Sequence, residues 1–347
     1  MQTTPQTILV TGANGLIGRW LVPALLDQGY RVLAAMRQHE SRAAEYQTWV
    51  QQHVQQPFHP ERLQLCEFRL EQVDTLFSAP DRQHLIAVYH LAAAFHWGLD
   101  RRHAHQVNVE AGNRVLELAA ALPNLQRFIW IGGYRVAYAP QLDTDGLYKT
   151  LGGYEASKQI SHQQMKQKAN QLQLPWTALH PSSVIGDSRS GETTQFIGAA
   201  ELVQQLQQGK MPAIPGDRTT FLPLVHVDFV AEFASRLLQY PSSVNQEYWL
   251  LDDTTPPLPQ LLHRIAHHLQ VKAPSRQVPL WLLRRLPAFL LPGSKETLSF
   301  LGSDRYDVSN TRQLATEMGI EARLQLGNLE AWVDYLVEHR LQLHTNT

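Results

Sequence analysis

The sequence predicts an α/β protein with a Rossmann-type doubly wound parallel sheet and a smaller, mostly helical C-terminal substrate lobe. Short apolar runs that suit buried strands alternate with longer amphipathic runs that suit helices, and this alternation is typical of parallel sheets. The first strand leads into three closely spaced glycines and a helix start, which is the arrangement that binds a dinucleotide. The chain has 347 residues, more than one core usually serves, so we expect two unequal lobes.

The first strand covers residues 7–10 and the first helix covers residues 19–28. Between them, Gly12 permits a sharp turn, Gly15 lets a pyrophosphate approach the backbone, and Gly18 lets the helix pack against the strand. A helix N-terminus offers unpaired N–H groups and positive dipole character to an anion. We therefore expect a dinucleotide to lie along Gly12, Asn14, Gly15, Leu16, Ile17 and Gly18.

The end of the second strand, residues 30–37, should select the cofactor. A carboxylate there would bind the ribose 2′-OH of NAD, whereas a cation would accept the 2′-phosphate of NADP. Arg37 stands at this position, and Arg19 lies close by in the turn-helix segment. The sequence therefore predicts NADP, with NAD as the alternative if both arginines are simply solvated.

Three more strands are predicted at residues 63–68, 86–91 and 127–131, and helices at 41–56 and 103–122. The fourth strand ends at Leu91 and is followed by the small residues Ala92, Ala93 and Ala94, which would let a ligand lie close to the backbone. The fifth strand ends in two glycines, Gly132 and Gly133.

Tyr154 and Lys158 open a long helix that is predicted to run to about Leu172. A spacing of four places the phenol and the ammonium on one helix face, close enough for the cation to stabilise a tyrosinate. A phenol with a pKa near 10 is a poor acid–base catalyst at neutral pH unless a neighbouring cation lowers that pKa.

These residues resemble the extended short-chain dehydrogenase/reductase family, which contains sugar-nucleotide epimerases and dehydratases, dihydroflavonol-type ketone reductases and thioester reductases. The resemblance runs nearly end to end and is closest in character to the carbonyl and thioester reductases. It rests on six motifs in the family's order: residues 11–18 (TGANGLIG), 90–93 (HLAA), 108–110 (NVE), Tyr154 with Lys158, 180–186 (HPSSVIG) and 225–228 (VHVD).

The resemblance implies that Tyr154 is the general acid or base on the substrate oxygen. It also implies that Lys158 binds the nicotinamide ribose while lowering the pKa of the tyrosine, and that Asn108 supports the active-site helix. Residues 181–184 would flank the nicotinamide. The cofactor contacts expected beyond the glycine turn are Arg19, Arg37, Leu91, Ala92, Ala93, Tyr154, Lys158, Pro181, Ser183 and Val184.

The chain departs from the family at the end of the fifth strand, where a Ser or Thr hydroxyl usually binds the substrate oxygen and this sequence has Gly132 and Gly133. A missing donor at a developing oxyanion costs roughly a hundredfold to a thousandfold in rate. Either Tyr134, Ser182 or Ser183 supplies the hydrogen bond, or the activity is slow or absent. A second departure, Arg69 in place of an Asp near the adenine, would add positive charge there.

The expected substrate contacts are His96, Gly133, Tyr134, Ser182 and Trp281. Trp281 belongs to the most apolar run of the chain, residues 278–291. That run is interpreted either as a core helix, as a wall or lid for an acyl or other apolar substrate, or as a shallow membrane contact.

The Rossmann-type domain is predicted at residues 1–186 and 221–251, and the substrate lobe at 187–220 and 252–347. A net charge of −1 gives no electrostatic reason to expect nucleic acid or an acidic membrane as partner. The single cysteine, Cys66, excludes an internal disulfide, and a short polar start without a spanning apolar run predicts a soluble cytoplasmic protein. His263 and His267 lie four apart without a third ligand nearby, so no metal site is predicted.

The predicted function is an NADP-dependent oxidoreductase that reduces a carbonyl or acyl-thioester group, with Tyr154 as acid or base. One alternative is a sugar-nucleotide epimerase or dehydratase, for which Arg218, Arg276 and Arg305 would hold the nucleotide diphosphate. Another is an NADP-binding sensor or scaffold of weak or no activity. The family resemblance also suggests a homodimer through the helices at 103–122 and 153–172.

Overall fold

The computed structural model describes residues 6–69, 73, 74, 76, 84–285, 298, 300–320 and 326–345. The chain divides into two compact units, and each is described by itself. The first unit comprises Met1–Pro181 and Val230–Trp249, and the second comprises Ser182–Phe229 and Leu250–Thr347. The lobe boundaries predicted from the sequence stay a prediction.

The first unit is built on a seven-stranded sheet with the order β10-β6-β5-β4-β1-β2-β3. Parallel pairing runs from β3 through to β6, which confirms the predicted doubly wound sheet. The order reverses between β1 and β4, the position where such sheets bind ligands at their carboxyl edge. The strands are β1 (Thr7–Thr11), β2 (Arg31–Met36), β3 (Leu63–Glu67), β4 (Leu85–His90), β5 (Arg127–Ile131), β6 (Trp176–Pro181) and β10 (Gln246–Leu250).

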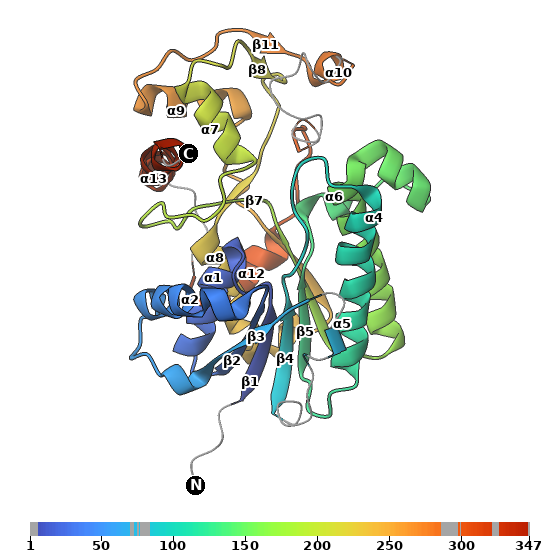
Figure 1. Cartoon of the computed structure of the whole chain (residues 1–347). Coiled ribbons are helices and arrows are strands. Elements are labelled where there is room, and N and C mark those ends of the chain that lie inside the picture. Colours follow the sequence, from blue (N-terminus) through green and yellow to red (C-terminus); the bar gives the residue numbers. More distant parts are fainter. Residues whose placement is uncertain are drawn as a thin grey trace. The chain divides into compact units, whose positions relative to one another are not determined.

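Helices cover both faces of this sheet, with α4, α5 and α6 on one face and α1 and α2 toward the other (Figure 1). A core cluster joins the sheet to α5 and α6 through side chains such as Phe128, Trp130 and Met165, all at most 2% exposed. The helices are α1 (Leu16–Asp27), α2 (His39–His53), α4 (Arg101–Ala104), α5 (Ala111–Ala120), α6 (Thr144–Gln171) and α8 (Val227–Arg236). This packing holds the carboxyl ends of β1, β4 and β5 in fixed positions.

Helix α6 begins earlier than the sequence predicts. Asp143 caps it, with Oδ1 accepting a hydrogen bond of 2.7 Å from the Gly146 N–H. The helix then breaks at Gly152, whose φ of 80° and ψ of 179° are not helical. A Cβ on Gly153 would lie 2.0 Å from the Leu99 carbonyl oxygen, so the second part of the helix approaches that backbone closely. The part of α6 that carries Tyr154 therefore starts where the sequence predicts a helix to start. It is preceded by another part of the same helix and a break at Gly152, and not by a loop.

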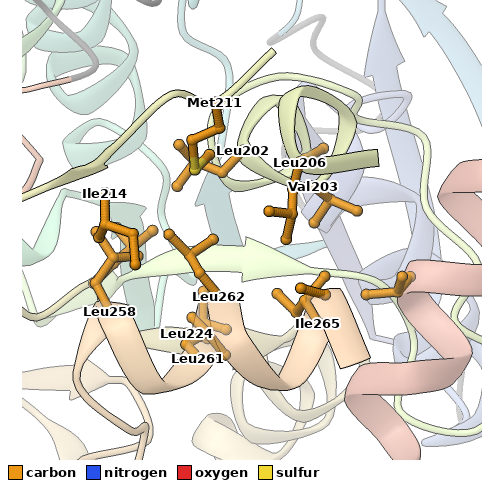
Figure 2. Packing of buried hydrophobic residues seen from close by; sticks show 14 of the residues in the cluster. Leu202, Val203, Leu206, Met211, Ile214, Leu224, Leu258, Leu261, Leu262 and Ile265 are labelled. Atoms are coloured by element: carbon orange, nitrogen blue, oxygen red, sulfur yellow. The ribbon is translucent and has the colours of Figure 1, made fainter. Parts of the chain in front are cut away.

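The second unit is mostly helical and has a core of its own. On α9, Leu258, Leu261, Leu262 and Ile265 recur at helical spacing and face side chains of α7, including Leu202, Val203 and Leu206 (Figure 2). His263 and His267 lie on the exposed side of α9. The helices are α7 (Ala199–Gln207), α9 (Leu258–His268), α10 (Leu280–Leu283), α12 (Ser309–Met318) and α13 (Leu326–Thr345).

The strand β9 (Leu224–His226) is short. It pairs with β7 (Ser183–Ile185) in a separate two-stranded sheet rather than with the large sheet. Pro223 has no N–H to donate, which explains why regular pairing starts after it. A second small sheet joins β8 (Ile214–Pro215) to β11 (Gln277–Val278).

Trp281 lies in the short helix α10 with its side chain 60% exposed, whereas Leu283 of the same helix is buried. The described start of the apolar run is thus only partly core. Residues 286–291 of that run lie outside the described residues. No helix in the described part of the chain has the length and apolar character to cross a membrane.

Candidate active site

The turn after β1 packs directly against the segment that follows β4. Gly12 has a φ of +72°, and a Cβ there would lie 2.8 Å from the Ala92 backbone nitrogen. The Leu91 N–H donates to the Thr11 carbonyl oxygen at 3.2 Å, which joins the two strand ends. A side chain at position 12 is excluded both by its backbone angle and by this contact.

The start of α1 fits a pyrophosphate. Gly15 is its N-cap, and no side chain caps the free N–H groups of the first turn. A Cβ on Gly18 would lie 2.4 Å from the Gly12 carbonyl oxygen, so the helix packs closely on the turn. The predicted cradle residues, Asn14, Leu16 and Ile17 among them, come together here, with Ala92 and Ala93 partly or fully exposed beside Gly12.

The two arginines predicted for NADP differ. The Arg19 guanidinium makes an ion pair of 2.7 Å with Glu45 and lies 5.0 Å from the ring centre of Trp49, so it is already held by α2. Arg37 follows β2, is exposed, and makes no ion pair with another described residue. Arg37 is therefore the better placed of the two to accept a 2′-phosphate.

Glu67 at the end of β3 accounts for Arg69. Its carboxylate accepts hydrogen bonds from the His39 backbone N–H and from Arg69 Nε at 3.1 and 3.0 Å and contacts the His39 ring at 2.9 Å. The hydrogen bonds from His39 and Arg69 lower the pKa of Glu67 to about 2. The sequence analysis expected Arg69 to add positive charge near the adenine. In the structure its charge is instead neutralised by Glu67.

Asn108 connects two elements of the site. It lies in the π-helical segment η3 (His105–Glu110), a form that is frequent at functional sites. Its amide oxygen accepts from the Ala94 N–H at 2.7 Å, and its Nδ2 donates to Ser157 Oγ at 2.9 Å. Asn108 therefore ties the segment after β4 to α6, one residue before Lys158.

Lys158 is anchored at the end of β5, where Nζ donates a 2.6 Å hydrogen bond to the Ile131 carbonyl oxygen. Burial lowers the pKa of Lys158 to about 8, and the Glu155 carboxylate opposes that shift. Tyr154, one turn earlier, packs its ring 4.5 Å from that of Phe95. Burial raises the pKa of Tyr154, and the Glu155 charge adds to the rise. This differs from the expectation that Lys158 lowers it, because desolvation dominates here.

The two glycines after β5 are not equivalent. A Cβ on Gly132 would lie 2.3 Å from Nδ1 of His180, whereas a Cβ on Gly133 would meet no atom within 4 Å. The His180 imidazole thus fills the place of a side chain at 132, and position 133 is open. Tyr134 is one of the residues predicted to replace the missing Ser or Thr hydroxyl after β5. It is buried, with 4% of its surface exposed.

His180 belongs to a buried polar cluster that sequence reasoning missed. Its Nε2 lies 2.9 Å from Glu247 Oε2, and His162 Nε2 lies 3.3 Å from the same oxygen. These three groups stand close enough to hold a metal ion. However, Lys166 pairs with the other Glu247 oxygen, and neither histidine Nδ1 has a described partner of the kind that orients metal-bound imidazoles. The chemistry favours a hydrogen-bonded network.

The remaining predicted residues are dispersed. His96 is exposed after β4, and Pro181 ends β6 in the first unit. Ser182, Ser183, Val184 and Trp281 belong to the second unit, so their contacts with cofactor or substrate stay predictions. Sequence reasoning also overlooked Phe95 and the buried pair Arg135–Glu155. The alternation of the aromatic residues Phe95 and Trp97 could have indicated Phe95 as a site residue. No sequence pattern indicates the Arg135–Glu155 pair, because its members lie far apart in the chain.

A model of the NAD dependent epimerase/dehydratase family matches residues 8–250. The NRPS-like oxidoreductase fscA of Fusarium equiseti is 26% identical over 196 residues, which cover 53% of this chain and 18% of that relative. The chain thus spans less than a fifth of that protein's length.

Two solved structures share the fold. The terminal R domain from the myxalamid PKS-NRPS biosynthetic pathway has a TM-score of 0.76 at 19% identity, covering 98% of this chain and 92% of that one. UDP-glucuronic acid 4-epimerase from Bacillus cereus in complex with NAD has a TM-score of 0.66 at 18% identity, covering 96% and 99%. At these identities the likeness supports the fold alone.

Serine at position 132 should destabilise the protein, and serine at position 133 should not. Gly132→Ser forces the His180 ring to move, and overpacking of this kind costs about 1–3 kcal/mol of unfolding free energy. Gly133 has an extended φ of −144° and open space, so Gly133→Ser should be neutral or stabilising. Denaturant unfolding compares the two variants; equal losses of stability would contradict the account.

Acid should destabilise the fold through its buried histidines. Burial lowers the pKa of His180 to about 4, despite the opposing Glu247 carboxylate, and that of His90 to about 3. Between about pH 6.5 and about pH 4 the unfolded chain therefore binds protons that the folded chain does not, and stability falls as the pH falls, by up to about 1.4 kcal/mol per pH unit for each histidine.

Unfolding free energies measured by denaturant across this range test the point. His180→Asn should reduce the slope, and His263→Asn, which alters an exposed histidine, should leave it unchanged. An unfolding free energy of the wild type that stays constant between about pH 6.5 and about pH 4 would contradict this prediction.

Proposed function

We propose that this chain, which belongs to the NAD dependent epimerase/dehydratase family, is an NADP-dependent oxidoreductase that reduces a carbonyl or acyl-thioester group. The observation that carries the proposal is the hydrogen bond from Lys158 Nζ to the Ile131 carbonyl oxygen, 2.6 Å long. It fixes an ammonium at the carboxyl end of β5, on the helix that carries Tyr154. A glycine cradle suited to a pyrophosphate stands at the carboxyl end of β1 in the same sheet.

In the proposed reaction the nicotinamide, when bound, supplies the hydride. The residues of the chain bind, orient and move the proton. Tyr154 would donate its phenolic proton to the oxygen of the acceptor carbonyl, and Lys158 would hold the nicotinamide ribose through its ammonium. With an acyl thioester, the hemithioacetal formed in this way would expel its thiol and leave an aldehyde. Asn108 holds the helix segment of Lys158 next to the chain that follows β4, through its hydrogen bonds with Ala94 and Ser157. Tyr154 is converted to the phenolate and recovers its proton from solvent.

The surroundings of Tyr154 favour an apolar acceptor. Phe95 packs on its ring, Trp97 packs edge-on against Phe95 at 5.5 Å, and both are only partly buried. Tyr154 also packs against an apolar cluster that includes Leu99, Leu147 and Ile160. An aryl or acyl group gains more from such a wall than a sugar does. The name of the fungal relative, an NRPS-like oxidoreductase, points the same way.

NADP is proposed over NAD because Arg37 is exposed directly after β2, where the adenosine ribose of such cofactors binds. A cytoplasmic location and a homodimer through residues 103–122 and 153–172 stay predictions.

An epimerase or dehydratase is the second candidate, favoured by the name of the family. The second unit contains the Arg305 guanidinium 3.7 Å from the ring centre of Phe221, a cation that a nucleotide diphosphate would require. A third candidate, a sensor without turnover, gains only from the missing hydroxyl at positions 132 and 133.

Net oxidation of NADPH in the presence of aldehydes, ketones and acyl thioesters tests the proposal. Tyr154→Phe should lower kcat/KM by at least about a hundredfold, because the proton donor is lost while the ring remains. Gly133→Ser should raise kcat by up to roughly a hundredfold, which is the effect of one well-placed hydrogen-bond donor on a developing oxyanion.

Gly132→Ser is the matched control, since its hydroxyl would collide with His180. The reductase proposal fails if no carbonyl substrate consumes NADPH, or if Tyr154→Phe retains wild-type turnover. Conversion of a sugar nucleotide with no net change in the cofactor would establish the epimerase instead.

A further inference from the structure

Glu155 is a buried carboxylate in the catalytic helix that the proposed reaction does not use. It follows Tyr154 directly, lies three residues before Lys158, and is 6% exposed. Its Oε1 stands 3.4 Å from Arg135 Nε and accepts a 3.1 Å hydrogen bond from Gln159 Nε2. A carboxylate is strongly disfavoured in such a place unless it is paired.

Arg135 approaches Glu155 from a different element. It lies in the short helix η4 (Tyr134–Tyr138), which begins right after Gly133, and its side chain is 21% exposed. The ion pair therefore ties the segment after β5 to the helix segment that starts at the Gly152 break. Both ends of this tie lie within a few residues of groups that the proposed reaction uses.

Glu155 is also the carboxylate that acts on Lys158 within the described residues. The other titratable groups that face Lys158 are His90 at the end of β4 and His180 on β6. Burial keeps both imidazoles neutral at pH 7, so neither adds a charge. Among the described residues, the Lys158 ammonium thus has the Ile131 carbonyl as its hydrogen-bond partner and the Glu155 carboxyl three residues earlier on the same helix.

We propose that the Arg135–Glu155 pair is a positioning element that keeps the Lys158 ammonium charged and seated at the end of β5. Burial raises the pKa of the Glu155 carboxyl, and the Arg135 guanidinium and the Gln159 amide work against that rise. They favour the ionised form, which balances the ammonium. The link to cofactor binding rests on the proposed function, in which Lys158 binds the nicotinamide ribose. Glu155 and Arg135 themselves contact neither cofactor nor substrate in this scheme.

The proposal predicts the sign of a titration shift. Burial lowers the pKa of Lys158 to about 8, and Glu155 works against that fall. Removal of the Glu155 charge should therefore lower the Lys158 midpoint further, by roughly one pH unit or more. At neutral pH a larger share of Lys158 would then be uncharged.

The test follows the Lys158 side chain by NMR in the full chain labelled with 13C at lysine Cε, with Lys158→Met used to assign the signal. Glu155→Gln removes the charge and keeps the shape, whereas Glu155→Asp keeps the charge. We expect the midpoint to fall in Glu155→Gln and to stay near the wild-type value in Glu155→Asp. NADPH affinity, measured by fluorescence, should begin to weaken at a correspondingly lower pH in Glu155→Gln.

The double variant Arg135→Gln with Glu155→Gln leaves no unpaired buried charge, so it keeps the test open if Glu155→Gln alone does not fold. Its Lys158 midpoint should also lie below that of the wild type. A wild-type midpoint in the charge-removing variants overturns the inference, as does an equal fall in Glu155→Asp. Because the NMR midpoint needs no turnover, an absence of NADPH consumption would refute the proposed function without deciding this result.

Discussion

A lysine ammonium held on a backbone carbonyl at the end of β5 is the interaction on which the site depends. Lys158 is partly buried where its ammonium reaches the Ile131 oxygen, and burial lowers its pKa. Positive charge on its neighbours would destabilise a cation in this position. His90 and His180 are neutral imidazoles at pH 7 because burial lowers their pKa values. Burial raises the pKa of the nearby Glu155 carboxyl, and Arg135, Gln159 and Lys158 favour its ionised form.

Close backbone approaches set the rest of the geometry. Gly12 lies against Ala92, Gly18 against the Gly12 carbonyl, and Gly132 against His180, and in each case a Cβ would collide with a neighbour. The first two contacts join the ends of β1 and β4 to the start of α1 and so leave the helix N-terminus open to an anion. In the third contact, the His180 imidazole from β6 occupies the space that a side chain at position 132, after β5, would need. Of the two glycines after β5, Gly133 has open space beside it and Gly132 does not, which explains why the two are predicted to respond differently.

The sequence predicted the sheet, the cradle and the Tyr154–Lys158 helix because these features depend on local patterns. Alternating strands and helices fix a doubly wound sheet, and glycine spacing fixes the turn after β1. The partners of Arg19 and Glu155 were beyond reach, since each depends on contacts between distant segments. Arg19 meets Glu45 and Arg135 meets Glu155 only after folding, and no spacing in the sequence reports such pairs. The environment of Tyr154 was misjudged for a related reason, because desolvation follows from packing.

The central claim is that this chain transfers hydride to an external carbonyl. Its most direct test is incubation of the full chain with NADPH deuterated at nicotinamide C4 and a panel of aryl and acyl aldehydes or thioesters, with mass analysis of the products. The account predicts deuterium on the carbon of the reduced carbonyl group, in amounts equal to the NADPH consumed. Products without deuterium, or a cofactor that returns unchanged while a sugar nucleotide is converted, would contradict it.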